Sequence, residues 1–332
     1  MRISHYFEWE ESITGGHRQS VDNQRKILDR KNIEYTTSPD LEADVLHLNN
    51  MGPKSLYYAW RARKKDIKVV IHAHQTAEDL RNSFRFSNIL AKPLKPYLKY
   101  AYSLADRVIC PSEHNRKVME GYTDSPKTVV SNGFDPDKLE GYRKLRQDYL
   151  DRYDLEPPVV FNVGHVIKRK GLETFVETAR KMPETDFVWF GFLNPTGEDR
   201  LIDSFLQSSD TKEIVENSPD NCTFTGYIDD IRGAYAAGDI FFLPTQNENE
   251  GMALLEAMSC GKPPVIRNIK TYEWLTEGEN CLKAENNFVP LIEELKNERL
   301  RQRIGGRAEE KSREFELEKV GEELVSVYRE LV

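Results

Sequence analysis

Residues 239–267, DIFFLPTQNENEGMALLEAMSCGKPPVIR, decide the fold of this chain. The run 239–244 is almost wholly apolar, which predicts a short strand in a parallel sheet covered on both faces. A polar loop follows over 245–251, and a helix is predicted over 252–260 with Gly261 at its C′ position. Lys262-Pro263-Pro264 then breaks the pattern, and Val265-Ile266 begin another buried strand. This β-loop-α-β unit places the loop and the helix N-terminus at the carboxyl edge of the sheet, where open α/β sheets bind ligands.

Two carboxylates flank this loop: Glu248 lies within it and Glu256 falls in the second turn of the helix. Between them lie backbone amides at a helix start, a position that favours anionic groups. Carboxylates accept from hydroxyl groups and amides donate to hydroxyl or phosphate oxygens, so the pattern predicts a site for a sugar joined to a phosphate. The alternative is that Glu256 is a solvated helix residue and Glu248 a loop charge. The predicted amide donors are Asn249, Glu250, Gly251 and Met252.

The run ENEGMALLEAMSCGKPPV, residues 248–265, resembles the most specific motif of the family 4 glycosyltransferases. These are retaining enzymes with the two-domain GT-B fold. The resemblance implies that Glu256 binds the ribose hydroxyls of a nucleotide and that Glu248 contacts the donor sugar next to the reaction centre. Asn249 and Glu250 stand where the family usually has an aromatic residue or a proline, so the identity of the sugar does not carry over.

The composition is that of a globular protein, and 332 residues are enough for two domains of ordinary size. No apolar run is long enough for a membrane-spanning helix, and the N-terminus MRISHYFEWEES does not read as a secretory signal. Four scattered cysteines without a CxxC pair predict buried thiols in a reducing cytoplasm.

The net charge of −8 conceals an asymmetry between the two halves of the chain. Residues 1–150 hold 25 Lys/Arg against 20 Asp/Glu, net +5, whereas residues 151–332 hold 22 against 35, net −13. A basic N-terminal half indicates an anionic surface or acceptor as its partner. Nucleic acid is disfavoured, because the chain is acidic overall and has no recognised binding module.

The N-terminal half begins with strands predicted over 2–6, 44–48 and 68–71. Gly15 and Gly16 follow the first strand in a polar loop. The family resemblance implies that these glycines let the backbone approach the donor phosphates, and the alternative is an ordinary turn.

His72 and His74 follow the third strand, with Glu78 close by. The pair lacks the helical H-E-x-x-H arrangement and a third ligand of suitable spacing, so no metal site is predicted, and a metal site remains the alternative. The stretch HQTAEDLRNSF resembles the H-T-x-x-E-D segment of the diacylglycerol glucosyltransferase branch of the family. The resemblance implies a catalytic and acceptor-side role for His74, with Glu78 on the acceptor side, and leaves His72 as a structural residue.

Residues 80–105 combine five cations with no Asp or Glu, and aromatic and aliphatic side chains lie between the cations. On short helices this pattern suits the headgroup region of an anionic bilayer. The alternative is an amphipathic helix pair with a solvated basic face. The cations predicted to contact the membrane are Arg81, Arg85, Lys92, Lys95 and Lys99.

The second half opens on a β-branched strand over 159–163, followed by the run GHVIKRKG. Basic side chains beside a glycine turn and a helix start suit a diphosphate, and a surface Lys/Arg cluster is the alternative. The run resembles the family motif G-R-L-x-x-x-K-G, with Gly164 and Lys170 at its glycine and lysine. His165 replaces the usual arginine, and Arg169 supplies a cation in its place.

Further strands are predicted over 187–191 and 222–227. The second of these ends in Thr225-Gly226-Tyr227, where the family places contacts to the nucleobase, so Thr225 and Tyr227 join the predicted donor site. A helix over 313–331 carries one apolar stripe, which predicts that this face is buried.

These patterns predict an α/β protein, and the resemblance implies the GT-B fold: two Rossmann-like domains facing a cleft. Residues 1–153 are expected to form the acceptor and membrane-facing domain, and 154–312 the nucleotide-sugar domain. By analogy with the family, 313–332 form a helix that crosses back to the first domain.

The expected activity is a retaining, metal-independent transfer of a hexose from a nucleotide sugar, UDP-glucose by resemblance, to a hydroxyl of a membrane glycerolipid of the diacylglycerol type. No cofactor, nucleic acid or obligate protein partner is expected, and the expected location is cytoplasmic, peripheral on the inner face of the cell membrane. The alternatives are the same donor chemistry on a soluble or polysaccharide acceptor, a sugar-nucleotide binding protein without turnover, and a metal hydrolase centred on His72 and His74.

Overall fold

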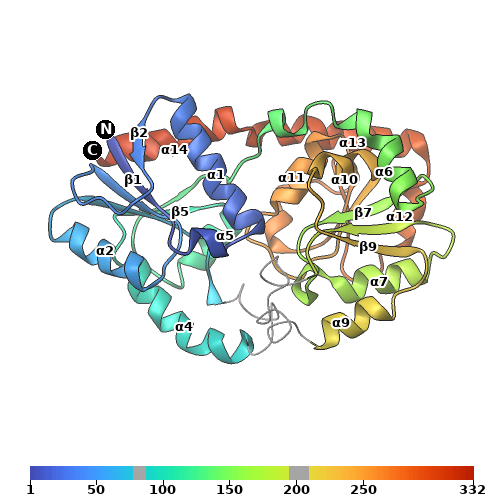
Figure 1. Ribbon diagram of the computed structural model, residues 1–332, viewed down its shortest axis with the longest axis horizontal. Coiled ribbons are helices and arrows are strands. Elements are labelled where there is room, and N and C mark those ends of the chain that lie inside the picture. The colour runs from blue at the N-terminus through green and yellow to red at the C-terminus, as the bar shows by residue number, and fades with distance from the viewer. Residues whose placement is uncertain (78–86, 194–208) are drawn as a thin grey trace. The chain divides into compact units, whose positions relative to one another are not determined.

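The computed structural model describes residues 1–77, 87–193 and 209–332, which form two compact units (Figure 1). The first unit holds the described residues up to Phe134 together with Phe315–Val332, and the second holds Asp135–Glu314. Each unit is a parallel β-sheet with helices on both faces, so the predicted α/β class is confirmed.

The first sheet has its six parallel strands in the order β2-β1-β3-β4-β5-β6. After β1 the chain moves to one side to form β2 and then continues on the other side with β3, so a topological switch point lies between β1 and β3. The three-residue edge strand β2 was not predicted, because it is too short to show an alternating pattern. The strands are β1 (Arg2–Tyr6), β2 (Glu34–Thr36), β3 (Val45–Leu48), β4 (Lys68–His72), β5 (Arg107–Cys110) and β6 (Lys127–Val129).

One face of the first sheet is covered by α1 (Gly15–Arg30) and α14 (Leu317–Leu331), which pack together (Figure 1). Gly321 of α14 leaves room for Ile27 of α1, because a Cβ at Gly321 would lie 3.0 Å from the Ile27 side chain. The predicted apolar stripe of the last helix is therefore part of the core of the first unit. This helix begins later than predicted, since Arg313–Phe315 form a 3-10 turn.

The other face of the first sheet is covered by α2 (Pro53–Arg63), α4 (Ser87–Tyr102) and α5 (Glu113–Met119). Their buried side chains form a second core with β3, β4 and β5, in which α2 contributes Ala59 and Ala62 and α4 contributes Leu98 and Tyr102.

The second sheet has its six parallel strands in the order β12-β11-β10-β7-β8-β9, with a switch point between β7 and β10. The β10-loop-α11-β11 unit predicted from residues 239–267 is confirmed, and Gly261 follows α11 with φ 68°. The strands are β7 (Val160–Val163), β8 (Phe187–Phe190), β9 (Cys222–Gly226), β10 (Ile240–Leu243), β11 (Pro264–Arg267) and β12 (Leu282–Ala284).

Helices cover both faces of the second sheet. One core is formed with α6 (Arg146–Tyr153), α10 (Ile231–Ala237) and α11 (Met252–Ser259). The other is formed with α7 (Leu172–Arg180), α9 (Ser209–Glu216) and α12 (Val289–Leu295), and α13 (Glu298–Ser312) contributes to both cores.

The unit boundary lies at Phe134–Asp135, whereas the predicted boundary follows residue 153. The segment between the two positions packs on the second core. The ring of Tyr149 lies where a Cβ at Gly233 would be, and Arg146 forms an ion pair with Asp239 at 3.0 Å. Tertiary packing therefore joins α6 to the second unit, although the Pro-Pro pair after it reads as a hinge in the sequence.

Among the described residues, every helix is too short or too polar to cross a membrane.

Candidate functional site

The loops that follow β7 and β10 are joined at the switch point of the second sheet. Gly171, with φ 86°, lies so close to β10 that a Cβ would be 2.3 Å from the carbonyl oxygen of Pro244. The amide of Gln246 donates to the carbonyl of Arg169 at 2.8 Å, and Arg169 Nη1 donates to the carbonyl of Asn247 at 2.8 Å. The two sequence motifs predicted to bind a donor, 164–171 and 248–256, therefore lie side by side.

Glu248 lies between two cations in this pair of loops. Its carboxylate pairs with the ammonium of Lys170 and lies 3.9 Å from Nη1 of Arg169, and Thr245 Oγ1 donates to it at 3.3 Å. Burial acts to raise the pKa of Glu248, but Lys170 and then Arg169 outweigh it and hold the pKa below its usual value. Because Glu248 is only 7% exposed, the alternative of a solvated loop charge is wrong.

The neighbouring Lys168 has different partners, although it belongs to the same 3-10 turn (Lys168–Lys170). Its ammonium pairs with Asp210 at 2.7 Å and with Glu173 at 3.4 Å. Arg169 and Lys170, the two residues predicted to bind a diphosphate, are those that turn toward Glu248.

The N-terminus of α11 begins at Met252, directly after this loop. Gly251 precedes it with φ 96°, and a Cβ there would lie 2.8 Å from the hydroxyl of Tyr272. Thr271 Oγ1 donates to the carbonyl of Glu248 at 2.7 Å, and this hydrogen bond fixes the loop. Asn249 and Glu250 lie in the loop between these points, so the predicted amide donors are held at a helix start.

Glu256 is buried one turn into α11. It is 6% exposed, and the hydroxyl of Tyr235 donates to its Oε2 at 2.6 Å. Burial first, and then Glu256, raises the pKa of Tyr235 well above its usual value. A solvated helix residue would not need a buried partner, so this alternative is also wrong.

An aromatic row lies along the ends of β7, β8 and β9. β7 and β8 are each followed by a glycine and then an aromatic residue, and β9 ends in Gly226, which Tyr227 follows. The rings of Phe192 and Tyr227 stack with centroids 4.6 Å apart and an interplanar angle of 17°, and His165 meets Phe192 edge-on at 5.7 Å. Tyr227 is 61% exposed, so one ring face is open to a ligand. Sequence analysis identified Tyr227 but missed Phe192, although the repeated glycine-aromatic pair is visible in the sequence.

Two of the three glycines in this row border open space, whereas a Cβ at Gly191 would lie 2.0 Å from the carbonyl oxygen of Gly164. A Cβ at Gly164, φ 134°, or at Gly226, φ 70°, would meet no heavy atom within 4 Å. The Thr225 hydroxyl instead donates to the carbonyl of Gly226 at 2.9 Å, so this side chain is held by backbone. Burial, followed by Lys170 and Arg169, lowers the pKa of His165 to about 4.

In the first unit, Gly15 and Gly16 are exposed at the start of α1 rather than in a loop. Gly15 has φ 70°, a backbone conformation that glycine adopts without strain. The two glycines stand at the carboxyl edge of the first sheet, next to its switch point.

Five buried or half-buried histidines lie together behind this edge. The rings of His72 and His74 are stacked, with centroids 4.1 Å apart and planes at 3°, and His17 lies 4.3 Å from His74. Burial is the first cause that lowers the pKa of each, to about 4 for His5 and His17, to about 3 for His72, and well below the usual value for His47 and His74.

This histidine cluster is held by polar contacts to the elements around it. His5 Nε2 lies 2.9 Å from Gln24 Oε1, and His47 Nδ1 lies 2.6 Å from the hydroxyl of Tyr328 on α14. Parallel stacked rings direct their nitrogen lone pairs side by side and not toward a common point, which opposes the metal alternative for His72 and His74. In the part of the chain that the structure describes, no group of three or more potential ligands is arranged to hold a metal ion.

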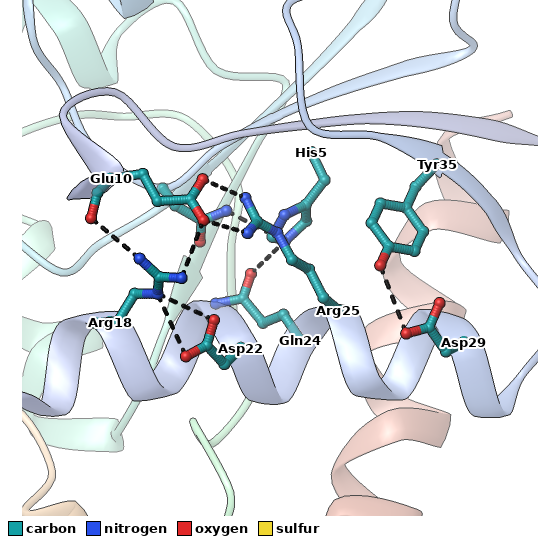
Figure 2. Close-up of polar contacts among 9 residues, drawn as sticks. His5, Glu10, Arg18, Asp22, Gln24, Arg25, Asp29 and Tyr35 are labelled. Carbon is teal, nitrogen blue, oxygen red and sulfur yellow. Dashed lines mark hydrogen bonds and ion pairs between the residues drawn. The ribbon is translucent and has the colours of Figure 1, made fainter.

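A charged network fixes the loop between β1 and α1 (Figure 2). Arg25 donates two hydrogen bonds to the carboxylate of Glu10, at 2.5 and 2.8 Å, and Arg18 lies 3.3 Å from Glu10 and 3.1 Å from Asp22. The hydrogen bond from Arg25 is the main cause that lowers the pKa of Glu10. Sequence analysis did not identify these residues, because their pairing depends on how the loop folds back along α1.

The predicted membrane segment is described in part. Glu78, Arg81 and Arg85 lie outside the described residues. In α4, Lys92 and Lys99 are exposed, whereas Lys95 is half-buried with its Nζ 5.3 Å from the ring centroid of Tyr122.

Comparison with known proteins shows which protein family the chain is related to. The family model described as Glycosyltransferase Family 4 matches residues 24–138, and the one described as Glycosyl transferases group 1 matches residues 157–318. The processive diacylglycerol alpha-glucosyltransferase of Acholeplasma laidlawii is 32% identical over 93% of this chain and 92% of that protein. The alpha-galactosylglucosyldiacylglycerol synthase of Streptococcus pneumoniae is 27% identical over 81% of this chain and 71% of that protein.

Among solved structures, Anabaena HepE in complex with UDP-glucose superposes with a TM-score of 0.77 at 16% identity, covering 99% of this chain and 100% of that one. This likeness confirms the predicted GT-B fold, and the sequence relatives extend over both units. The chain therefore belongs to the family 4 glycosyltransferases and is an enzyme of that class.

Proposed function

We propose that this glycosyltransferase moves glucose from UDP-glucose to a hydroxyl of a membrane glycerolipid of the diacylglycerol type, with retention at the anomeric carbon. The observation that carries the proposal is the placement of Glu248 between Lys170 and Arg169 at the start of α11. The names of the relatives from A. laidlawii and S. pneumoniae, which concern glycosylated diacylglycerols, support the lipid acceptor.

In the donor half, Lys170, Arg169 and the amides before α11 would hold the diphosphate. Negative charge develops on the UDP leaving group as the glycosidic bond breaks, and fixed cations with helix N-terminal amides stabilise that charge. Glu256 would accept from the ribose hydroxyls, and the open face of Tyr227 would stack on the base. Glu248 would accept from a hydroxyl of the sugar.

In the first unit, His74 and the glycines at the start of α1 would serve the sugar and the acceptor. Burial lowers the pKa of His74 well below its usual value, so at neutral pH the ring offers one donor and one acceptor nitrogen without charge. A neutral imidazole suits a sugar or lipid hydroxyl. Gly15 and Gly16 would let backbone approach the donor, while Glu78 and the cations from Arg81 to Lys99 would meet the acceptor and its anionic membrane.

The test is a product analysis. The protein is incubated with UDP-glucose, UDP-galactose or UDP-N-acetylglucosamine and with vesicles that contain diacylglycerol, and the lipids are examined by mass spectrometry. A hexosyl-diacylglycerol from UDP-glucose, with an α-anomeric proton signal by NMR, is expected. EDTA should leave the rate unchanged.

Glu248→Gln should abolish most of this transfer, and Glu273→Gln, a change at an exposed glutamate of the same unit, should not. Product on a soluble sugar acceptor but none on lipid would contradict the acceptor assignment. Strong inhibition by EDTA that Mn²⁺ reverses would contradict the metal-independent mechanism.

A further inference from the structure

Helix α2 of the first unit carries its large and small side chains in an unusual arrangement. The residues buried against β3 and β4 are small: Ser55, Ala59 and Ala62. Two of its three aromatic residues face outward, with Tyr57 49% and Trp60 43% exposed, whereas Tyr58 is half-buried and packs against the core. Packing on the sheet therefore does not explain why two adjacent turns of α2 carry aromatic side chains, since the core uses the opposite side of the helix.

Cations surround these two aromatic residues. Lys64 Nζ lies 3.6 Å from the ring centroid of Trp60, and the guanidinium of Arg61 lies 5.7 Å from that of Tyr57. Residues 53–68 hold six Lys/Arg and one acidic residue, Asp66, a local net charge of +5. This excess points to an anionic partner.

The C-terminal ends of α2 and α4 lie close together in the first unit. Both helices pack on the same core over the same face of the first sheet (Figure 1). Arg63 at the end of α2 donates to the carbonyls of Ser103 and Leu104, just beyond the end of α4, at 3.4 and 3.3 Å. On α4, Tyr100 is 55% exposed. We name this the α2–α4 surface and define it by Tyr57, Trp60, Lys64, Lys92, Lys99 and Tyr100.

We propose that the α2–α4 surface docks on an anionic bilayer, with Trp60 and Tyr57 of α2 entering the boundary between headgroups and acyl chains. Trp and Tyr favour this boundary because one part of the ring is apolar and another part donates hydrogen bonds. The lysines add attraction to anionic headgroups. The inference rests on the proposed function for its biological sense, and it adds a second membrane-contacting helix outside residues 80–105.

A bilayer fits this surface better than a nucleic acid does. A base that stacks on a protein needs an open aromatic face. One face of Trp60 already carries the ammonium of Lys64, and the guanidinium of Arg61 lies over the Tyr57 ring. In a bilayer the same pair is compatible, since the ammonium can meet a phosphate while the ring lies deeper.

The experiment compares one double substitution with one control substitution in the full-length protein. Tyr57→Ser with Trp60→Ser removes the aromatic part of the α2–α4 surface. The matched control is Trp9→Ser: Trp9 is 56% exposed in the same unit, but its neighbours in the sequence are Glu8, Glu10 and Glu11. Each protein is sedimented with vesicles of phosphatidylglycerol and phosphatidylcholine, and with pure phosphatidylcholine, at low salt and at about 0.5 M salt.

The double variant should partition into anionic vesicles about tenfold less than the wild type, with the difference kept at high salt because the apolar contribution is not screened. Trp9→Ser should bind as the wild type does. Brominated acyl chains should quench tryptophan emission in the wild type and in Trp9→Phe, and much less in Trp60→Phe.

Equal sedimentation of the double variant and the wild type would overturn the inference. So would quenching that survives in Trp60→Phe, or a Trp60-dependent affinity for single-stranded DNA that exceeds the affinity for vesicles. To keep the result separate from the proposed function, UDP affinity and transfer to diacylglycerol in detergent micelles are measured on the same variants. Loss of vesicle binding with both retained supports the docking surface, whereas absence of product in the wild type would refute the proposed function and leave the vesicle result standing.

Discussion

The carboxyl edges of the two sheets keep buried polar groups in different charge states: neutral in the first and ionised in the second. Behind the edge of the first sheet, burial lowers the pKa of five histidines, so their rings are neutral at pH 7 and pack against one another. At the edge of the second, Glu248 is buried as deeply but stays ionised, because two cations face it. The comparison shows that burial alone does not set the charge of a site: a counter-charge at contact distance decides it.

The largest expected effect is a loss of order in the first unit at acid pH. The unfolded chain binds protons at its histidines below about pH 6.5, whereas folded His5 and His17 bind them near pH 4. Stabilisation is therefore complete above about pH 6.5 and is lost as the pH falls toward 4, on the order of 3 kcal/mol for His5 alone.

Hydrogen exchange, corrected for its intrinsic pH dependence, measures this loss in each unit separately. Near pH 5, peptides from β1, β3 and β4 should lose protection before those from β7 and β10, because the low pKa of Glu248 keeps its ion pairs intact there. Earlier loss in the second unit would show that the histidine cluster does not control acid stability.

The next effect removes the counter-charge from the second edge. Lys170→Met should weaken UDP binding by roughly 1.5–3 kcal/mol, about 10- to 150-fold, since one hydrogen bond between charged groups is lost. Calorimetry with UDP gives the value. Lys168→Met is the matched control, because Lys168 belongs to the same turn but pairs with Asp210 and Glu173. If both changes weaken binding equally, the turn acts only through its overall charge.

A smaller effect is expected when the histidine cluster loses one neutral partner. Tyr328→Phe removes the hydroxyl beside His47 Nδ1 and should lower the free energy of unfolding by about 1–3 kcal/mol, because a buried polar atom loses its partner. Urea denaturation measures it. Tyr35→Phe, which removes a 3.5 Å contact to Asp29 in the same unit, should change stability by less than about 0.5 kcal/mol.

The smallest effect concerns donor affinity after Glu248→Gln. This change should leave UDP affinity unchanged or raise it by a few-fold, since Lys170 and Arg169 no longer have an internal counter-ion. The same variant should lose transfer activity, which separates binding from chemistry. A marked fall in UDP affinity by calorimetry would mean that Glu248 supports the nucleotide site and not the sugar.

The second edge was largely predictable from the sequence, and the first was not. Glu248 and Glu256 lie in one 29-residue stretch, 239–267, whose strand, loop and helix are set by local apolar runs and one glycine. The histidine cluster joins residues from β1, α1, β3 and β4, and their contacts depend on strand register. No local pattern carries that information. His72 and His74 were therefore considered as a pair, and the other three histidines were missed.

The unit boundary was misplaced for the same reason, because it depends on contacts between residues that are distant in the sequence. The Pro157-Pro158 pair marks a chain turn, but only the fit of Tyr149 against Gly233 reveals that α6 belongs to the second unit. The aromatic row, by contrast, could have been predicted from the sequence, because Gly191-Phe192 repeats the pattern of Gly226-Tyr227.

Because α14 packs on α1, the core of the first unit closes only after the second unit has been synthesised. The ribosome completes every residue of the second unit, Asp135–Glu314, before it adds the helix that closes the core of the first. At bacterial or eukaryotic elongation rates this interval is on the order of ten seconds. Throughout it, Ile27 and Leu28 on the nascent chain lack their final apolar partners, so the unit that begins first is the unit that is finished last.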